Sequence, residues 1–374
     1  MSDPLRVVMA PDSFKGTATA VDAAAALARG WSLRRPGDQV VCVPLADGGE
    51  GTLDALGAGL VPESRRTATV TGPLGDRVEA EWLLRPDGAA VVELARAAGL
   101  HLLHPHDAPG SLRATTAGVG DLLRHAAGDP GTTRVLLTLG GSATTDGGAG
   151  ALGALGAVFL DAAGRRLPPG GGALVDLARI DLDGLAAPPP EGLECLVDVT
   201  NPLLGPRGAA VVFGPQKGAS PAAVTVLDGA LTRFAEVLAD AAPHPVDPAT
   251  AGAGAAGGTA FGLLSCWPGR MVPGSAAVAD AVGLADQLQG ADLVVTGEGR
   301  FDMQSADGKV VGHLLGVADA AGVPVAVVAG RLDAAVPPGV IGVDLSHTAG
   351  SSEAASGEPL RWLAEAASLL AARM

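Results

Sequence analysis

Lysine and asparagine are so rare in this chain that each of them is a candidate for function. The 25 basic residues comprise three lysines and 22 arginines, and Asn201 is the one asparagine. The lysines, Lys15, Lys217 and Lys309, each have a glycine directly beside them. A composition that favours arginine so strongly leaves lysine where the chemistry needs a compact ammonium group, the point charge that suits a phosphate.

Five segments share one design: a predicted strand end, then glycines with a carboxylate, a hydroxyl or a lysine among them. They are residues 11–16, 47–52, 140–148, 198–201 and 296–302. Glycines let the backbone approach a ligand and expose N–H groups to an oxyanion. Carboxylates supply ligands for Mg²⁺ or a base for a substrate hydroxyl. Five such loops in one chain are more than turns alone would require.

Two common nucleotide-binding motifs are excluded. The chain contains no GxxxxGK[ST] segment, so it is not a P-loop enzyme. Residues 252–257 match GxGxxG, but they follow Pro248-Ala249-Thr250 and not a strand. A dinucleotide fingerprint needs a strand at that point. We therefore interpret this run as a phosphate-contacting turn or a close-packed helix start.

The elements that position these loops form strand–loop–helix units, which are typical of a parallel α/β sheet. Ligands of such sheets collect at the carboxyl ends of the strands. The apolar patterns predict strands over residues 6–10, 39–44, 66–70, 77–84, 89–94, 135–139, 193–199, 292–299 and 324–330. They predict helices over residues 19–31, 116–127, 221–242 and 310–321, with others beginning near 53 and 359.

The two ends of the chain resemble each other, whereas the middle has short alternating strands broken by turns. We therefore predict two α/β domains. Residues 1–65 with 285–374 form a Rossmann-like domain with a parallel sheet, and residues 66–284 form an inserted domain with a mixed sheet.

Composition limits the partners. Forty acidic residues against 25 basic ones give a net charge of −15, which argues against nucleic acid. No apolar run approaches the roughly 18 residues of a membrane span, and the start lacks a signal-peptide pattern. Three scattered cysteines without a CxxC pair fit a reducing compartment. We expect a cytoplasmic protein without membrane or nucleic-acid partners; homo-oligomerisation stays open.

Eight segments, in order, resemble the signature blocks of type I glycerate kinases, the bacterial glycerate 2-kinases. They are MAPDSFKG, PLADGGEGT, TGPLGD, GGSATTDGGAGA, DVTNPLLG, FGPQKGA, GAGAAGG and TGEGRFD with the following Gln and GK, and they span residues 9 to 309. All three lysines and Asn201 fall inside these blocks. The chain departs from the family pattern at four positions: Arg96, Thr145, Ser305 and Val311.

The resemblance implies transfer of the γ-phosphoryl group of ATP to D-glycerate, most often at the 2-hydroxyl, giving 2-phosphoglycerate and ADP. It also implies two α/β domains with the active site between them. Phosphoryl transfer needs charge neutralisation, an aligned hydroxyl and usually Mg²⁺ with the ATP. The substrates are then ATP and D-glycerate, both small molecules.

Within this frame each candidate residue has a role and a structural alternative. Lys15 and Lys217 are assigned to the phosphates or the glycerate carboxylate; the alternative is that they are ordinary surface lysines. Asp198 is the favoured base, with Asn201 beside it, and Asp47 and Asp302 are candidate metal ligands; the alternative for each Asp is a loop cap. Arg300 is a candidate for binding the glycerate carboxylate through two hydrogen bonds; the alternative is a structural salt bridge with a neighbouring acid. Further candidates for substrate or phosphate binding are Ser13, Gly48, Gly49, Gly141, Ser142, Glu298 and Lys309.

Two other functions remain alternatives. A regulatory module could bind glycerate or a nucleotide without catalysis, and a related kinase could act on tartronate or a longer aldonate. Release of ADP when D-glycerate is added to ATP separates an enzyme from a binding module. A substrate panel separates the kinases.

Overall fold

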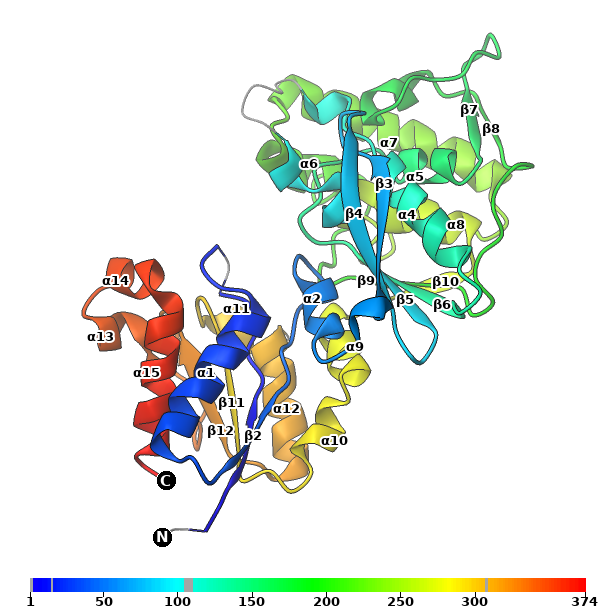
Figure 1. Ribbon diagram of the computed structural model, residues 1–374. Coiled ribbons are helices and arrows are strands. Elements are labelled where there is room, and N and C mark those ends of the chain that lie inside the picture. Colours follow the sequence, from blue (N-terminus) through cyan, green and yellow to red (C-terminus); the bar gives the residue numbers. More distant parts are fainter. Residues whose placement is uncertain (1–2, 15, 104–109, 307–308) are drawn as a thin grey trace. The chain divides into compact units, whose positions relative to one another are not determined.

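The structure, a computed structural model, describes all of the chain except residues 1–2, 15, 104–109 and 307–308. It divides into two compact units. The terminal unit comprises Met1–Asp47, Asp54–Gly59 and Gly274–Met374, and the inserted unit comprises Gly48–Leu53 and Leu60–Pro273. Both chain ends belong to the terminal unit (Figure 1).

The terminal unit contains a five-stranded parallel sheet with the order β13-β12-β11-β1-β2. Its strands are β1 (Arg6–Met9), β2 (Gln39–Cys42), β11 (Leu293–Glu298), β12 (Val325–Ala329) and β13 (Ile341–Asp344). In chain order this is a 2-1-3-4-5 sheet, whose connections change direction between β1 and β11. The Rossmann-like parallel sheet predicted from both termini is confirmed.

The central strands of this sheet are buried on both faces, which explains their continuous apolar runs. Val7 and Met9 pack with α1 (Ala20–Arg34) and α15 (Pro359–Ala371) on one face. Val8 packs with α10 (Leu284–Leu288) and α12 (Val310–Ala321) on the other. α1 and α15 lie side by side (Figure 1). A Cβ atom at Gly30 would lie 1.9 Å from the Ala364 oxygen, so this contact requires glycine.

The limits of the terminal unit differ from the predicted 65/66 and 284/285. α9 (Gly274–Ala281) packs against α10 and α12, and its Ala279 belongs to the same apolar core. This helix therefore belongs to the terminal unit and not to the inserted one. Residues 48–53, in turn, belong to the inserted unit.

The inserted unit contains a six-stranded mixed sheet with the order β10-β9-β6-β5-β4-β3. Its strands are β3 (Arg65–Thr71), β4 (Arg77–Leu84), β5 (Ala89–Glu93), β6 (Arg134–Thr138), β9 (Leu193–Leu196) and β10 (Gly269–Val272). β3, β4 and β5 pair antiparallel, whereas β5, β6, β9 and β10 are parallel. The predicted mixed sheet is confirmed.

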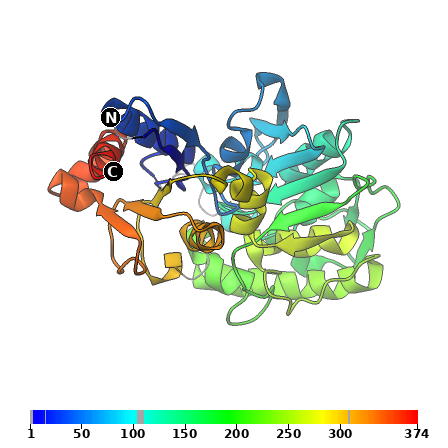
Figure 2. The same ribbon diagram turned by 90° about the horizontal axis from the view of Figure 1, so that it is seen from below.

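One large apolar core fills the inserted unit and joins this sheet to its helices. The helices that contribute to that core include α3 (Ala95–Ala98), α4 (Ala117–Ala127), α5 (Ala149–Ala154), α6 (Ala209–Phe213), α7 (Pro221–Ala241) and α8 (Thr259–Cys266). In Figure 2, α7 is the long light-green helix along one side of this unit. A two-stranded sheet of β7 (Val158–Leu160) and β8 (Arg179–Asp181) pairs separately.

Within the described part of the chain, no helix combines the length and the apolar character that a bilayer span demands.

Candidate active site

Three neighbouring parallel strands of the inserted unit end in segments that carry polar side chains. Glu93 is the last residue of β5, the glycine-rich residues 140–148 follow β6, and Asp198 follows β9. Because β5 pairs with β6 and β6 with β9, these three ends lie at one edge of the sheet. This is the edge where ligands of parallel α/β sheets bind.

Residues 140–148, which we call the β6 loop, are held by backbone contacts at their start. Leu100 N–H donates to the Gly141 oxygen at 2.9 Å, and Ala143 N–H donates to the Ala98 oxygen at 2.8 Å. A Cβ atom at Gly140 would lie 2.4 Å from the Cα of Gly49, so two predicted glycine loops touch here through their backbones.

The two predicted amide donors of the β6 loop differ in exposure, because Gly141 is exposed whereas Ser142 is buried. Among the residues that the structure describes, the N–H groups of Gly141 and Ser142 make no hydrogen bond. Gly141 is exposed and has a φ angle of 74°, a left-handed conformation that suits glycine. Backbone N–H groups in such a turn are suited to an oxyanion.

Two buried hydroxyl groups at this strand end also have no hydrogen-bond partner within the described chain. They belong to Thr138, the last residue of β6, and to Thr144 in the β6 loop. A buried polar group left without a partner costs about 1–3 kcal/mol. Such groups are typical of a site that a ligand or water completes.

Lys217 lies beneath the β6 loop and is almost completely buried. Its Nζ donates to the Ser142 Oγ at 2.8 Å and to the Thr144 oxygen at 2.6 Å. Burial lowers the pKa of Lys217 from 10.5 to about 7, although the nearby Asp146 charge opposes this shift. The alternative of a surface lysine is therefore wrong for this residue.

Asp146 is a buried carboxylate that the sequence analysis did not single out. It accepts hydrogen bonds from Thr116 N at 2.8 Å and from Thr116 Oγ1 at 2.9 Å. It also accepts from the N–H groups of Gly148 and Gly150, both at 3.2 Å. Burial raises the pKa of Asp146, and these hydrogen bonds oppose the rise. The signal in the sequence was an acid inside a run of glycines.

Glu93 is a second buried carboxylate that the sequence analysis missed. Its Oε1 accepts from Gly51 N at 3.2 Å and its Oε2 accepts from Leu53 N at 2.9 Å. Arg96 Nε lies 3.5 Å from Oε1. Glu93 therefore holds the end of the predicted glycine loop 47–52 against the end of β5.

Gly48 and Gly49 in that same loop are fixed through their carbonyl groups. Leu139 N–H donates to the Gly48 oxygen at 3.2 Å. The Gly49 oxygen accepts from Thr52 Oγ1 at 2.7 Å. Their predicted role in binding phosphate stays a prediction.

Asp198 and Asn201 follow β9, which ends at Leu196 and not at residue 199 as predicted. Asp198 is exposed. Asn201 Nδ2 donates to the Arg207 oxygen at 2.8 Å, and its backbone oxygen accepts from Gly254 N at 3.0 Å. The Asn201 amide nitrogen thus stabilises its own loop, whereas the Asp198 carboxylate is accessible.

Two candidates of the terminal unit, Ser13 and Glu298, lie at the carboxyl ends of β1 and β11, where the strand order reverses. Ser13 follows β1 and its N–H donates to Asp12 Oδ1 at 2.6 Å. Glu298 is the last residue of β11 and is buried. Asp12 N–H donates to the Gly297 oxygen at 2.8 Å and so joins the two strand ends. Lys15, predicted on this loop, lies outside the described residues.

The loop after β11 combines exposed cations with a capping carboxylate. Arg300 is 67% exposed and its Nε lies 2.5 Å from Asp333 Oδ2, the salt bridge considered as its alternative role. Asp302 Oδ1 accepts from Ser305 N at 3.2 Å, which is the capping arrangement. Lys309 is exposed at the start of α12.

The carboxylates predicted to hold Mg²⁺ are Asp47 and Asp302, which are both half-buried in the terminal unit. In the described part of the chain no three His, Cys, Asp or Glu side chains form a cluster that could hold a metal by itself. Mg²⁺ in kinases is commonly bound by one or two carboxylates together with substrate phosphates. Single carboxylates at strand ends fit that mode.

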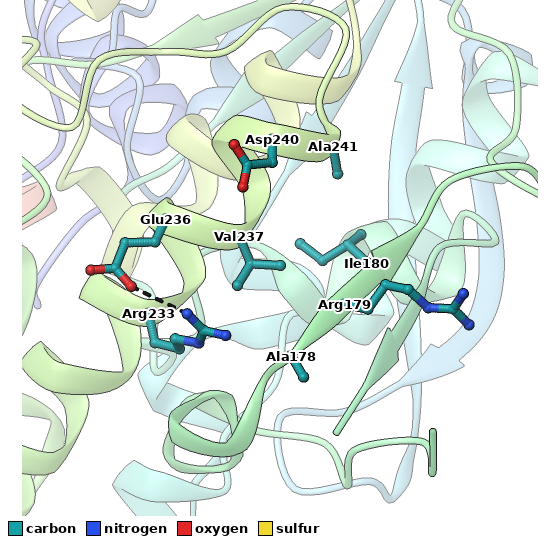
Figure 3. Close-up of a pocket in the computed structure, with 8 residues that line it drawn as sticks. All are labelled: Ala178, Arg179, Ile180, Arg233, Glu236, Val237, Asp240 and Ala241. Atoms are coloured by element: carbon teal, nitrogen blue, oxygen red, sulfur yellow. Dashed lines mark hydrogen bonds and ion pairs between the residues drawn. The ribbon is translucent and has the colours of Figure 1, made fainter. Parts of the chain in front are cut away.

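An open surface hollow of about 400 Å³ lies between β8 and the second half of α7. Figure 3 shows its lining, which includes the ion pair of Arg233 and Glu236 at 3.4 Å. None of the predicted site residues lines it. Its mixed lining of Arg179, Arg233, Glu236 and Asp240 gives no clear preference for an anion.

A buried lysine, glycine loops and carboxylates near the ends of parallel strands are typical of α/β enzymes that act on small anionic substrates. The comparison with protein families specifies which one. The chain belongs to the glycerate kinase family, whose model matches residues 7–371. Membership of this family makes the protein a kinase, that is, a phosphotransferase.

Individual relatives agree with this membership. A glycerate kinase of Bacillus subtilis (strain 168) is 44% identical over 88% of this chain and 85% of its own length. A glycerate 2-kinase of Escherichia coli (strain K12) is 42% identical over 88% of this chain and 86% of its own. A crystal structure assigned to glycerate kinase 2 of Salmonella typhimurium LT2 matches with a TM-score of 0.84 and 37% identity. That match covers 99% of this chain and 98% of the other.

Proposed function

We propose that the protein transfers the γ-phosphoryl group of ATP to the 2-hydroxyl group of D-glycerate, giving 2-phosphoglycerate and ADP. The observation that carries this proposal is the β6 loop, in which two amides make no hydrogen bond within the described chain and to which the buried Lys217 is hydrogen-bonded. Such a loop suits the negatively charged oxygens of a phosphoryl group or of the glycerate carboxylate. Membership of the glycerate kinase family supports the choice of acceptor.

The reaction needs a base for the acceptor hydroxyl and compensation of the phosphate charge. We assign the base to Asp198, because its exposed carboxylate follows β9 beside the β6 loop. As the glycerate oxygen bonds to the γ-phosphorus, the bond from that phosphorus to the β,γ-bridging oxygen breaks. The hydroxyl proton passes to Asp198. The amides of Gly141 and Ser142 are the proposed donors to the charged oxygens.

Mg²⁺, when it is bound with ATP, neutralises charge on the phosphates. We propose Asp47 and Asp302 as its protein ligands, since both are accessible carboxylates near strand ends. Ser13, Glu298, Arg300 and Lys309 remain proposed binding residues of the terminal unit.

We further propose a cytoplasmic location. All three cysteines, Cys42, Cys195 and Cys266, are free. Burial raises the pKa of the Cys266 thiol to about 12, and that of Cys195 rises still further. Unpaired, protonated buried thiols suit a reducing compartment.

The test is release of ADP from ATP and Mg²⁺ on addition of D-glycerate, compared with L-glycerate, tartronate and a longer aldonate. We expect the highest kcat/KM with D-glycerate. A higher value with another acid would overturn the choice of acceptor. Binding of D-glycerate without any ADP release would instead favour a regulatory module.

A further inference from the structure

Two buried charged side chains, Lys217 and Asp146, hold the β6 loop at two different points along its sequence. Lys217 binds Ser142 and Thr144 in the first half of the loop. Asp146 lies in the second half and binds Thr116, the residue before α4. The segment between Ser142 and Asp146 is therefore fixed at both ends.

Asp146 also connects the starts of two helices. Its carboxylate accepts from the N–H of Thr116 before α4 and from the N–H of Gly150 in the first turn of α5. Thr116 Oγ1 donates to the carboxylate and accepts from Ala151 N at 2.9 Å. A negative charge at helix starts is favourable because their free N–H groups and dipoles are positive there.

Neighbouring glycines restrict the middle of the loop. A Cβ atom at Gly257 would lie 2.2 Å from the Thr144 oxygen, and one at Gly171 would lie 1.9 Å from the Thr145 oxygen. The backbone of the loop therefore packs directly against two other segments. These anchors and close approaches restrict the backbone of residues 142–146, next to the Gly141 and Ser142 amides that make no hydrogen bond within the described chain.

We infer that Asp146 is a positioning residue for phosphoryl transfer, which with Lys217 fixes the β6 loop so that these amides meet the developing charge. This inference rests on the proposed function. Asp146 is completely buried, so it acts through the loop and not by contact with the substrate. Among the described residues it is also the charged group that acts on Lys217.

The experiment compares Asp146→Asn with the wild-type protein. Both carboxylate oxygens accept from a backbone N–H group, so an asparagine amide must place one donor against another in either orientation. We expect kcat to fall at least about tenfold, with KM for ATP and D-glycerate changed less than about threefold, because misplacement of a catalytic group acts mainly on the chemical step. A folded variant with wild-type kcat would overturn the inference.

Thr116 supplies a matched pair in case Asp146→Asn fails to fold. Thr116→Ser keeps the hydroxyl group and should keep kcat within about threefold of wild type. Thr116→Val removes the hydroxyl group, which donates to Asp146 and accepts from Ala151 N, and should lose kcat as Asp146→Asn does. Equal kcat values in these two variants would also overturn the inference.

Hydrogen exchange separates this inference from the proposed function. Amides of residues 140–148 should exchange faster in Thr116→Val than in Thr116→Ser, whereas those of β12 should not change. If the wild-type protein does not phosphorylate glycerate, the proposed function fails. If the amides of residues 140–148 exchange equally fast in Thr116→Val and Thr116→Ser, the positioning of the β6 loop by Asp146 and Thr116 fails, whatever the reaction.

Discussion

At the residue scale, the Lys217 side chain is buried and donates hydrogen bonds to two acceptors of the β6 loop. Two acceptors lie 2.6 and 2.8 Å from its ammonium nitrogen, and the side chain is 6% exposed. A chain that uses arginine almost everywhere keeps lysine at this point. The physical reason is size, because a compact ammonium group fits where a planar guanidinium does not.

Lys217→Arg should therefore lower kcat/KM by about tenfold or more, since the larger group must displace the β6 loop. The measurement is steady-state kinetics with D-glycerate and ATP. Arg361→Lys serves as the control, because this arginine is 63% exposed on α15. Unchanged kinetics in Lys217→Arg would show that the site tolerates either cation.

Burial of Lys217 also predicts a pH dependence of stability. Its pKa is about 7 in the folded protein, against an ordinary value of 10.5. Between these values the unfolded chain binds the extra proton, so this group makes the free energy of unfolding rise as pH rises from about 7 to about 10.5. Urea unfolding at pH 7 and pH 9.5 should show a larger rise in the wild type than in Lys217→Met. An equal change in the free energy of unfolding of both proteins would contradict a lowered pKa of Lys217 in the folded state.

Asp198 differs from the buried carboxylates because it is exposed. Asp198→Asn keeps the shape but removes the charge and most of the basicity. We expect kcat to fall on the order of 10²-fold or more, as general-base removal does, with a nearly unchanged melting temperature. A variant that melts several degrees lower yet turns over normally would make Asp198 structural, with Asp47 the next candidate for the base.

At the scale of elements, close backbone packing holds the β6 loop. Gly171→Ala would place a Cβ atom 1.9 Å from the Thr145 oxygen, a backbone atom that cannot rotate away. We expect a loss of about 1–3 kcal/mol in the free energy of unfolding, measured with denaturant. Gly229→Ala within α7 is the control: nothing lies within 4 Å of its Cβ position, so it should stabilise the helix by about 0.5–1 kcal/mol. Equal effects of both changes would contradict this account of the loop.

Apolar patterning predicted most of the elements that carry the site. α12 has the predicted bounds, and β4 and α7 agree with prediction to within a residue. The short helices α5 and α8 were missed because neither has a polar face: α5 consists of Ala, Gly and Leu, and every residue of α8 is buried. The predicted strand beyond Leu196 was too long, since an apolar residue such as Val199 can also lie exposed in a loop.

Residue types located the candidate site better than they assigned its roles. Lys217 was predicted from its rarity, but its partners come from segments far away in the sequence. Glu93 and Asp146 were missed because a carboxylate inside an apolar strand or a glycine run gives no local sign of what it binds. Asn201 was predicted as a residue beside the base, and residue type alone did not show that its side-chain nitrogen bonds to the Arg207 carbonyl group.

At the scale of the whole molecule, each unit has neighbouring parallel strands whose ends carry the predicted loops. The terminal unit follows the 2-1-3-4-5 order, and the inserted unit adds antiparallel strands at one edge. The family match extends over residues 7–371 and so includes both units. The central claim is therefore about the reaction of the complete chain.

The most direct test of that claim is the position of the phosphate in the product. The purified protein is incubated with Mg²⁺, ATP and D-glycerate, and the product is offered to enolase, which accepts 2-phosphoglycerate. We predict that enolase converts it without any phosphoglycerate mutase. Conversion that begins only after the mutase is added would identify 3-phosphoglycerate and contradict the proposed transfer to the 2-hydroxyl group.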